Sequence, residues 1–408
     1  MEALKQEKIA KQTHAEYFGL SEDIKSVNDI YITIPWGYDK NEIAKSGKCD
    51  WNVLNDHITF KQANDSFNYK TNNYPKVRTF VEKCIYQILD PKKNVLSLGE
   101  DRLEVDDWSG RVTYEEYNIH GDTFHVRVAS NEESFLEDLV MEFGMYEMLM
   151  HKQERAGGLY LFTGDMGSGK STTIYSFISS YLRENGGEAV TYEEPVEKIL
   201  PQEIGRGRVF QNHIPLNANW SKIGRRARRF QPSSSGNIIL IGEISSYETA
   251  KIAVSSALLG TNVISSTHGA SPRDVIHNLR DCLNSGENTK HETTNNLISQ
   301  TLRFISHQRI EDNSFSQGKN WDIKRVVSQF LFNPYSENSK TISNMLKDEE
   351  LTSLDTILEQ QATKMNNALV ETGFNELLQN TSINDLTPEQ KQFRFDSVNS
   401  KFIKEAMK

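Results

Sequence analysis

The 408-residue sequence is poor in cysteine, and its cysteines are badly placed for any shared site. There are three of them, Cys49, Cys84 and Cys282, which lie far apart and form no CxxC pair. This odd number and wide spacing argue against a disulfide scaffold or a zinc ribbon. Free thiols fit a reducing cytosol, so we expect a cytoplasmic protein.

Long apolar segments are also missing. No stretch approaches the roughly 18 uninterrupted apolar residues that a membrane-spanning helix needs. The N-terminal residues, MEALKQEKIAKQTHAEYF, are charged and lack the apolar centre of a secretory signal. We therefore expect any contact with a membrane to be peripheral or to pass through a partner protein.

Positive charge is in deficit, with 46 Lys and Arg against 56 Asp and Glu, which gives a net charge of -10. A chain with this balance is not a general binder of nucleic acid or of anionic lipid, so we expect no direct nucleic-acid partner outside local basic patches. The composition, 37% hydrophobic and 25% charged, is that of a soluble protein, and the length suggests about two or three domains.

The first part of the chain predicts a small α+β domain. Residues 1–25 resemble a charged helix, 77–89 another helix, and 131–155 a helix or two bridging to the next block. Short alternating segments between them predict strands, and His120-Gly121-Asp122 predicts a hairpin turn. The predicted strands are DIYITI (29–34), HITF (57–60), NVLSLGED (94–101) and the two halves of GRVTYEEYNIHGDTFHVRVAS (110–130).

From residue 159 onward, apolar strands alternate with helical stretches. This order is typical of a parallel sheet covered by helices on both faces. After about residue 285 we expect mostly helix, with a strand near 325–332, and residues 345–408 read as a polar helical appendage. The predicted parallel strands are LYLF (159–162), AVTY (189–192), IILI (238–241) and NVISS (262–266).

Residues 161–173, LFTGDMGSGKSTT, contain the pattern G-x-x-x-x-G-K-[ST] between a predicted strand and a predicted helix. Only bare backbone curls tightly enough to aim many N–H groups at a phosphate chain, and the helix N-terminus adds its positive dipole. A lysine in this position reaches the β- and γ-phosphates, and the following hydroxyl holds Mg²⁺. The residues predicted to bind ATP are Gly164, Gly167, Ser168, Gly169, Lys170, Ser171 and Thr172.

Polar residues follow three later predicted strands. They are the glutamates of YEEPVE (192–197), Glu243 at the end of NIILIGEI (237–244) and His268 in NVISSTHGAS (262–271). Each of these residues alone is weak evidence for a catalytic site, because a glutamate pair usually lies in a solvated turn and a lone histidine is usually structural. Ligands gather at the carboxyl ends of parallel strands, so their order after the phosphate loop favours nucleotide hydrolysis. No N-K-x-D guanine signature is present, which disfavours a GTPase.

The order GxxGSGKST, E-[DE]-P-[VI]-E, ILxGE and T-H resembles the traffic ATPases of type II and type IV secretion and of type IV pili. Within them the chain looks most similar to the pilus-retraction branch and its relatives in conjugation and type IVB secretion. The resemblance covers about 155–350 well and 27–150 loosely. It implies a hexameric cytoplasmic motor that works with inner-membrane components of its machine. It also implies a PAS-like N-terminal domain with linker (1–150), a RecA-like ATPase domain (151–344) and a helical C-terminal extension (345–408).

The resemblance also assigns residue roles. Lys170 would bind phosphate, while Ser171 and Glu243 would hold Mg²⁺. As the Walker B glutamate, Glu243 would polarise the attacking water. Glu193 and Glu194 fall in the family's acidic box and His268 in its histidine box, which makes them catalytic candidates. An arginine from the first domain completes the nucleotide site in this family, and Arg127 is preferred to Arg111 for that role.

Several positions depart from the family pattern. Tyr192 and Glu194 replace the isoleucine and aspartate of I-E-D-P, and Asp165 stands where proline is usual. Ser245 and Ser246 replace the arginine and aspartate that usually follow the Walker B glutamate, which puts the contact made by that pair in doubt. TISNMLK (341–347) only partly matches the retraction segment, so a retraction role is less certain than the ATPase.

The basic run GRRARRF (224–230) permits three interpretations: charge neutralisation at a subunit interface, a nucleic-acid patch, or a solvated helix face. The main hypothesis is a hexameric ATPase driving a secretion, conjugation or pilus machine. The alternatives are a RecA-type nucleic-acid motor and a nucleotide-gated scaffold that does not hydrolyse ATP. The sequence does not identify the machine, its substrate or the direction of its motion.

Overall fold

The computed structural model divides the chain into two compact units. One contains Met1–Asn131 with Pro195–Ile199, and the other Glu132–Glu194 with Leu200–Lys408. The predicted charged helix at 1–25 and the end of the C-terminal extension lie outside the described residues. The structure describes residues 29–37, 54, 58–62, 65–67, 75–90, 95–105, 108–115, 118–128, 133–139, 145–150, 157–215, 218–229, 237–286, 291–312, 323–333, 340–347 and 351–371.

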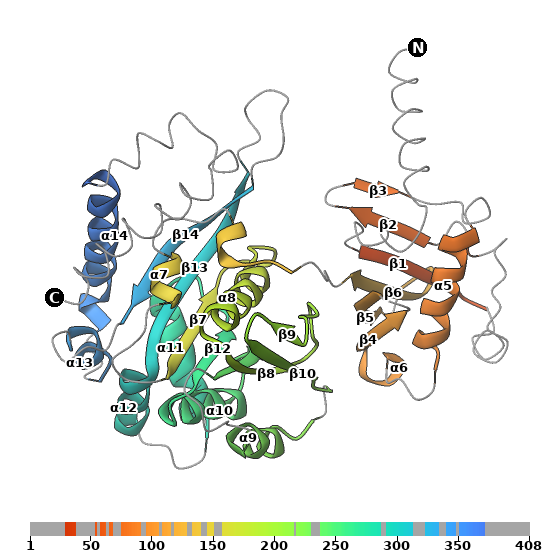
Figure 1. Cartoon of the computed structure of the whole chain (residues 1–408). Coiled ribbons are helices and arrows are strands. Elements are labelled where there is room, and N and C mark those ends of the chain that lie inside the picture. Colours follow the sequence, from red (N-terminus) through yellow and green to blue (C-terminus); the bar gives the residue numbers. More distant parts are fainter. Residues whose placement is uncertain are drawn as a thin grey trace. The chain divides into compact units, whose positions relative to one another are not determined.

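The first unit contains a six-stranded antiparallel sheet in the order β3-β2-β1-β6-β5-β4 (Figure 1). Alternate residues of β1, Ile30, Ile32 and Ile34, are fully buried, as the period of two in DIYITI predicts. They pack with buried residues of α5 in one hydrophobic core. The strands are β1 (Asp29–Pro35), β2 (Ile58–Gln62), β3 (Asp65–Phe67), β4 (Glu100–Val105), β5 (Trp108–Glu115) and β6 (Gly121–Val128).

Helix α5 (Pro75–Ile88) and the hairpin of β5 and β6 confirm two predictions from the sequence. The predicted strand 94–101 is wrong in its first half, because Val95–Leu98 form the short helix α6 before β4 begins. In the second unit, η3 (Leu136–Asp138) and α7 (Met145–Met150) are the described helical pieces of the segment that the sequence predicted as a bridge. The PAS-like assignment of this first unit stays a prediction.

The second unit is built on an eight-stranded sheet in the order β14-β13-β7-β12-β11-β8-β10-β9. The central pairs are parallel, and the edge strands β14 and β9 are antiparallel to their neighbours. All four predicted parallel strands are present, which confirms the mixed α/β class. The strands are β7 (Gly158–Thr163), β8 (Gly187–Glu193), β9 (Glu203–Ile204), β10 (Gly207–His213), β11 (Ile238–Glu243), β12 (Asn262–Ser266), β13 (Leu302–Asp312) and β14 (Ile323–Phe332).

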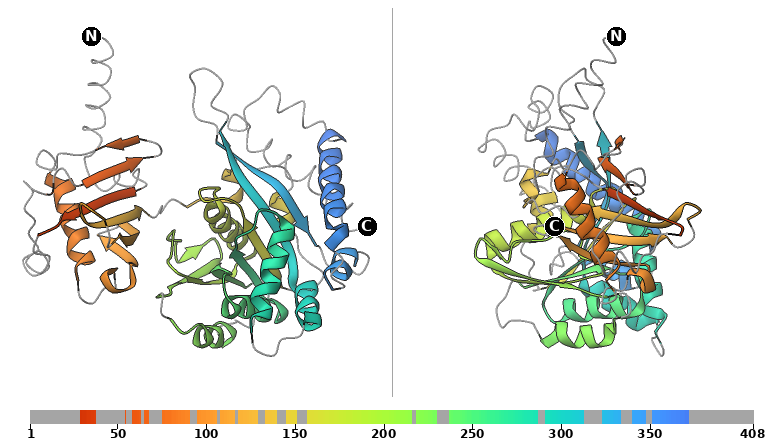
Figure 2. Two further views of the ribbon diagram at one scale, coloured as in Figure 1. Left: turned by 180° about the vertical axis from the view of Figure 1, so that it is seen from behind. Right: turned by 90° about the vertical axis from the view of Figure 1, so that its right-hand side faces the viewer.

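Helices cover both faces of this sheet (Figure 2). Tyr160 and Phe162 of β7 belong to the core under α8 (Lys170–Asn185), while Leu159 and Leu161 belong to the core on the opposite face. A central parallel strand is therefore apolar on both sides, as the run LYLF predicts. The helices of the opposite face are α9 (Trp220–Arg229), α10 (Tyr247–Leu258), α11 (Pro272–Asn284) and α12 (His291–Thr301).

The segment after residue 285 is less helical than predicted. Helix α12 ends at Thr301, and residues 302–312, part of which the sequence analysis read as helix, form the long strand β13 beside β7. Leu302 and Ile305 belong to the core on one face of the sheet and Phe304 to the core on the other, and a short run buried on both faces does not distinguish a strand from a helix by its period. The phosphate loop thus gains a neighbouring strand that the sequence analysis missed.

Helices α13 (Thr341–Lys347) and α14 (Leu354–Glu371), joined through η4 (Leu351–Ser353), pack into the second unit. Leu346 and Leu354 are fully buried in the same core as α10 and α11. The Gln361 side chain accepts a hydrogen bond from the Phe332 N–H at 3.0 Å and donates one to the Phe332 carbonyl at 2.7 Å. These two bonds satisfy the N–H and C=O groups of an edge-strand residue, and unpaired groups at a sheet edge can pair with a strand of another chain. The domain boundaries drawn from the sequence stay predictions.

Candidate functional site

The loop between β7 and α8 has the geometry of a phosphate cradle. Gly164, Gly167 and Gly169 have φ angles of 142°, 78° and 80°, which favour glycine over residues with a side chain. Gly169 is also the N-cap of α8, so the helix begins directly at Lys170. The loop therefore presents backbone at a helix N-terminus, where the unpaired N–H groups and the dipole attract an anion.

Lys170 lies across this loop. Its Nζ donates hydrogen bonds to the carbonyl oxygens of Gly164, at 2.8 Å, and Asp165, at 2.9 Å. Ser171 follows in the first turn of α8, where its half-buried hydroxyl is a hard oxygen ligand of the kind that Mg²⁺ takes alongside nucleotide phosphates. Gly167 and Thr172, also predicted to bind nucleotide, lie in the same loop and turn.

Asp165 is the loop residue that departs from the family pattern noted in the sequence. Its backbone carbonyl accepts hydrogen bonds from Ser168 N–H and Lys170 Nζ, so it contributes to the turn through its main chain. The side chain is exposed and interacts electrostatically with His307. The position thus tolerates an acid because the carboxylate faces solvent.

Strand β13 lies directly beside the loop and brings two residues that the sequence analysis did not select. His307 pairs in register with Thr163, the last residue of β7. Burial lowers the pKa of His307, and nearby Arg309 and Lys170 act in the same direction, whereas Asp165 and Asp274 oppose it. The neighbour Gln308 is fully buried against the loop. If residues 302–312 had been predicted as a strand, His307 and Gln308 would have been candidates for the phosphate-loop site.

The carboxyl ends of β7, β12 and β11 are joined by hydrogen bonds. Thr163 Oγ1 donates to the Gly269 carbonyl at 2.7 Å, and Thr267 N–H donates to the Phe162 carbonyl at 3.0 Å. Ser266 Oγ donates to the Gly242 carbonyl at 2.7 Å. These bonds tie the end of β7, the segment 266–269 and the end of β11 into one edge of the sheet, where α/β proteins bind ligands.

Glu243 and His268 meet at this edge, with 3.2 Å between Glu243 Oε1 and His268 Nε2. Their side chains are 44% and 81% exposed, so the pair is open to solvent and to a ligand. The Asn278 side chain donates to the His268 carbonyl at 2.7 Å and holds that segment. A carboxylate and an imidazole in contact can orient a water molecule and move its proton.

Glu193 has different surroundings from Glu243. It is only 3% exposed, and its carboxylate accepts hydrogen bonds from the hydroxyl of Tyr175 and, at 3.3 Å, from the amide of Gln211. Tyr175 lies on α8, so this contact links the end of β8 to the helix that follows the phosphate loop. Glu194 is half-buried at the same strand end. The structure gives Glu193 a positioning geometry, and its predicted catalytic role is untested.

Ser245 and Ser246, the departures from the arginine–aspartate pattern, lie immediately before α10. Ser246 is the N-cap, and its hydroxyl accepts a hydrogen bond from Thr249 N–H at 3.4 Å. The Thr249 hydroxyl in turn receives the backbone N–H groups of Ser245, at 3.3 Å, and Ser246, at 3.2 Å. The Ser246 side chain therefore caps the helix start, which is what serine does well, whereas Ser245 contributes its backbone N–H.

Arg127 lies on β6 of the first unit. Its Nε donates to Asp29 Oδ1 at 3.2 Å, and His125 Nε2 lies 2.7 Å from the same oxygen. The Arg127 side chain remains 56% exposed, and Arg111 pairs with it in register on β5. Its role as the arginine that completes a nucleotide site stays a prediction.

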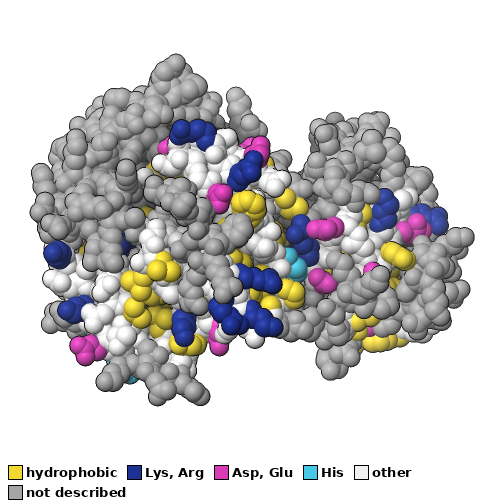
Figure 3. All heavy atoms as spheres, turned by 60° about the horizontal axis from the view of Figure 1, so that its bottom comes forward, with side chains coloured by type: hydrophobic (Ala, Val, Ile, Leu, Met, Phe, Trp, Pro, Cys, Tyr) yellow, Lys and Arg dark blue, Asp and Glu magenta, His cyan; other side chains and the backbone are white. Residues whose placement is uncertain are grey.

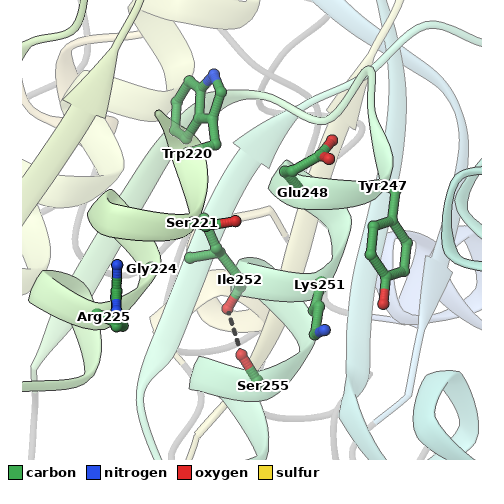
Figure 4. A pocket seen from close by; sticks show the side chains of 9 residues that line it. All are labelled: Trp220, Ser221, Gly224, Arg225, Tyr247, Glu248, Lys251, Ile252 and Ser255. Atoms are coloured by element: carbon green, nitrogen blue, oxygen red, sulfur yellow. Dashed lines mark hydrogen bonds between the residues drawn. The ribbon is translucent and has the colours of Figure 1, made fainter. Parts of the chain in front are cut away.

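A basic face lies on α9, where Lys and Arg side chains gather on the surface of the second unit (Figure 3). Lys222, Arg225 and Arg226 are exposed there. Beside them, α9 and α10 border an open pocket of about 390 Å³ (Figure 4). Its lining comprises Trp220, Ser221, Gly224, Arg225, Tyr247, Glu248, Lys251, Ile252 and Ser255. The pocket is separate in lining from the phosphate loop.

No helix in the described part of the chain is long and apolar enough to cross a bilayer.

Comparison with curated proteins finds type II secretion system protein E of Klebsiella pneumoniae, 29% identical over 230 residues, covering 50% of this chain and 44% of the relative. Competence protein ComGA of Streptococcus pneumoniae is 28% identical over 253 residues, covering 59% and 68%. The chain thus spans less than half the length of the secretion E relatives it matches.

Among solved structures, the chain is similar to the pilus retraction motor PilT with bound ADP, with a TM-score of 0.57 and 19% identity over 91% of this chain and 94% of that one. The Legionella pneumophila ATPase DotB has a TM-score of 0.57 and 17% identity, covering 85% and 87%. These likenesses concern the fold. The model of the family described as type II/IV secretion system protein matches residues 117–390, two thirds of the sequence, and the chain belongs to that family.

Proposed function

We propose that this chain is an ATPase that couples hydrolysis of ATP to motion in a secretion, conjugation or pilus machine. It would act as a homo-hexamer on the cytoplasmic side of the inner membrane, with Mg²⁺ bound beside the nucleotide. Membership of the type II/IV secretion family supports the class of machine. The similarity in fold to the pilus retraction motor PilT, whose structure has ADP bound, supports the nucleotide as the ligand of the loop.

The observation that carries the proposal is the joining of three strand ends. Hydrogen bonds connect the phosphate loop to the His268 segment and that segment to the Walker B strand. Glu243 Oε1 lies 3.2 Å from His268 Nε2 at this edge of the sheet. A phosphate chain in the loop would therefore have a carboxylate and an imidazole at the same edge of the sheet.

The roles of the residues follow from their chemistry. Lys170 would exchange its two loop carbonyls for phosphate oxygens, since an ammonium binds an anion more strongly than a neutral carbonyl. Ser171 would hold Mg²⁺, which neutralises phosphate charge when bound. Glu243 would orient the attacking water and take its proton, while His268 would contact the terminal phosphate. Glu193 would act through Tyr175 on the start of α8.

Steady-state hydrolysis of ATP by the wild type, Glu243→Gln and Lys170→Ala tests the proposal. Loss of a general base costs about 100-fold or more in turnover, so Glu243→Gln should hydrolyse far more slowly while still binding ATP. Lys170→Ala should lose binding as well. Glu248→Gln is the matched control, because Glu248 is an exposed glutamate on the neighbouring helix α10. Unchanged turnover in Glu243→Gln would refute the assignment of Glu243.

A nucleic-acid motor is the second candidate, and the exposed cations of α9 are the observation that favours it. Addition of single-stranded DNA should leave the ATPase rate unchanged if the secretion proposal is correct, and strong stimulation would favour the nucleic-acid motor. Light scattering with ATP present measures the assembly. A monomer at high concentration would contradict the hexamer, and ATP binding without turnover in the wild type would favour a scaffold.

A further inference from the structure

Gln308 is a fully buried amide that spans from strand β13 to the phosphate loop. Its Nε2 donates to the Ser168 carbonyl at 2.8 Å and to the Thr173 hydroxyl at 3.3 Å. A carbonyl oxygen only accepts, so the amide nitrogen must be the atom that faces Ser168. Within the described residues the amide oxygen of Gln308 has no hydrogen-bond partner, so the side chain is held entirely by what it donates.

The backbone of Gln308 forms the wall behind the same loop. A Cβ placed on Gly164 would lie 2.1 Å from the Gln308 carbonyl oxygen. Thr173, the second acceptor of the Gln308 amide, lies in the first turn of α8 and donates its own hydroxyl to the Gly169 carbonyl at 3.1 Å. Gln308 therefore touches the beginning of the loop, the residue before its last glycine and the start of the helix.

The hydrogen bond to Ser168 fixes the orientation of a peptide plane. In a trans peptide the C=O of one residue and the N–H of the next point in opposite directions. Because Gln308 holds the Ser168 carbonyl toward β13, the Gly169 N–H is turned to the opposite side, away from that wall. A flipped plane would instead present a carbonyl oxygen to the ligand and repel phosphate.

We propose that Gln308 is a positioning residue for phosphate binding, which sets the affinity for ATP by orienting the Ser168–Gly169 peptide. The inference rests on the proposed function, since it takes a nucleotide phosphate as the ligand of the loop. One hydrogen bond to a charged group changes affinity by about tenfold to a hundredfold. Loss of the Gln308 amide should therefore weaken ATP binding by this factor while leaving the catalytic carboxylate in place.

The test measures the equilibrium affinity of fluorescent ATP for the full chain and two variants. Gln308→Met keeps length and burial but removes the donor, and should weaken binding about tenfold to a hundredfold. Gln308→Glu places an acceptor against the Ser168 carbonyl and should weaken it at least as much. Gln361→Met is the matched control, since Gln361 is also a buried amide bonded to a strand backbone. That variant should lose stability but bind ATP like the wild type.

A second readout separates positioning from general damage to the fold. Saturating ATP should restore most of the turnover of Gln308→Met, so that KM rises more than kcat falls. ATP affinity of folded Gln308→Met equal to that of the wild type would overturn the inference, as would a loss equal to that of Gln361→Met. A wild type that binds ATP without turnover would overturn the proposed ATPase and leave this comparison of affinities valid.

Discussion

Substitution of Gly164 by alanine should damage both folding and nucleotide binding, because the site has no room for a methyl group. The added Cβ would lie 2.1 Å from the Gln308 carbonyl oxygen and 2.8 Å from Ser168 Oγ. The first of these atoms belongs to the backbone of β13, which is paired on both sides. The strand and the loop must therefore separate by about 1 Å, since Cβ contacts under 3.0 Å essentially never occur.

The magnitude can be bounded by comparison with Gly167 in the same loop. Both residues have positive φ, 142° and 78°, and an alanine in such a conformation costs about 1–3 kcal/mol. Within the described residues, a Cβ placed on Gly167 has no atom within 4 Å beyond its own and the adjacent residues, so Gly167→Ala costs only the backbone strain. Gly164→Ala adds the displacement of β13, which at the cost of an overpacked core is about another 1–3 kcal/mol.

Urea unfolding of the two variants and binding of fluorescent ATP provide the measurements. We expect Gly164→Ala to lose about 2–6 kcal/mol of unfolding free energy and Gly167→Ala about 1–3 kcal/mol. ATP affinity should fall further in Gly164→Ala, because displacement of β13 also moves Gln308. Equal stability of the two variants would refute the reasoning that β13 forms a rigid wall behind the loop.

Three further predictions follow from burial and capping. Burial lowers the pKa of His307 in the folded protein below its unfolded value of 6.5, so its contribution to stability is complete above about pH 6.5 and is lost as the pH falls toward the folded pKa. Urea unfolding between about pH 5 and pH 7.5 should therefore show a smaller loss of stability at low pH in His307→Gln than in the wild type, and parallel curves would contradict the lowered pKa of His307. Ser246→Ala should cost about 1 kcal/mol through loss of the α10 cap, whereas exposed Ser245→Ala should cost less, so an equal loss would argue against the cap. Leu354→Ala should cost about 2–5 kcal/mol in calorimetry, because Leu354 is fully buried in the core of the second unit, and a loss below about 1 kcal/mol would mean that α14 is a dispensable appendage.

Local patterns in the sequence identified the centre of the second unit correctly. The runs LYLF, AVTY, IILI and NVISS are each short, apolar and followed by polar or turn residues, and all four form parallel strands. The phosphate loop was readable because its glycines and lysine have a fixed spacing that the chemistry of phosphate demands. The resemblance to secretion and pilus ATPases is confirmed by the family match over residues 117–390.

Segments whose pattern fits two structures were read less well. The predicted strand 94–101 contains the helix α6, and residues 302–312, in the segment expected to be mostly helical, form β13. Strands β9 and β10 were missed, since Glu203–Ile204 and Gly207–His213 have little apolar periodicity and gain their structure from pairing with each other and with β8. In each case a neighbour distant in the sequence decides the conformation.

The sequence by itself determined the chemistry of the loop, because Gly164, Gly169, Lys170 and Ser171 act through local backbone geometry and fixed spacing. Tertiary structure alone decided what surrounds it. Strand order places β13 beside β7 and thereby brings Gln308, 140 residues away from Ser168, into contact with the loop. It also separates the exposed Glu243 from the buried Glu193, two glutamates at strand ends with the same local signal. Burial and partners are properties of the packed sheet, and no short stretch of sequence specifies them.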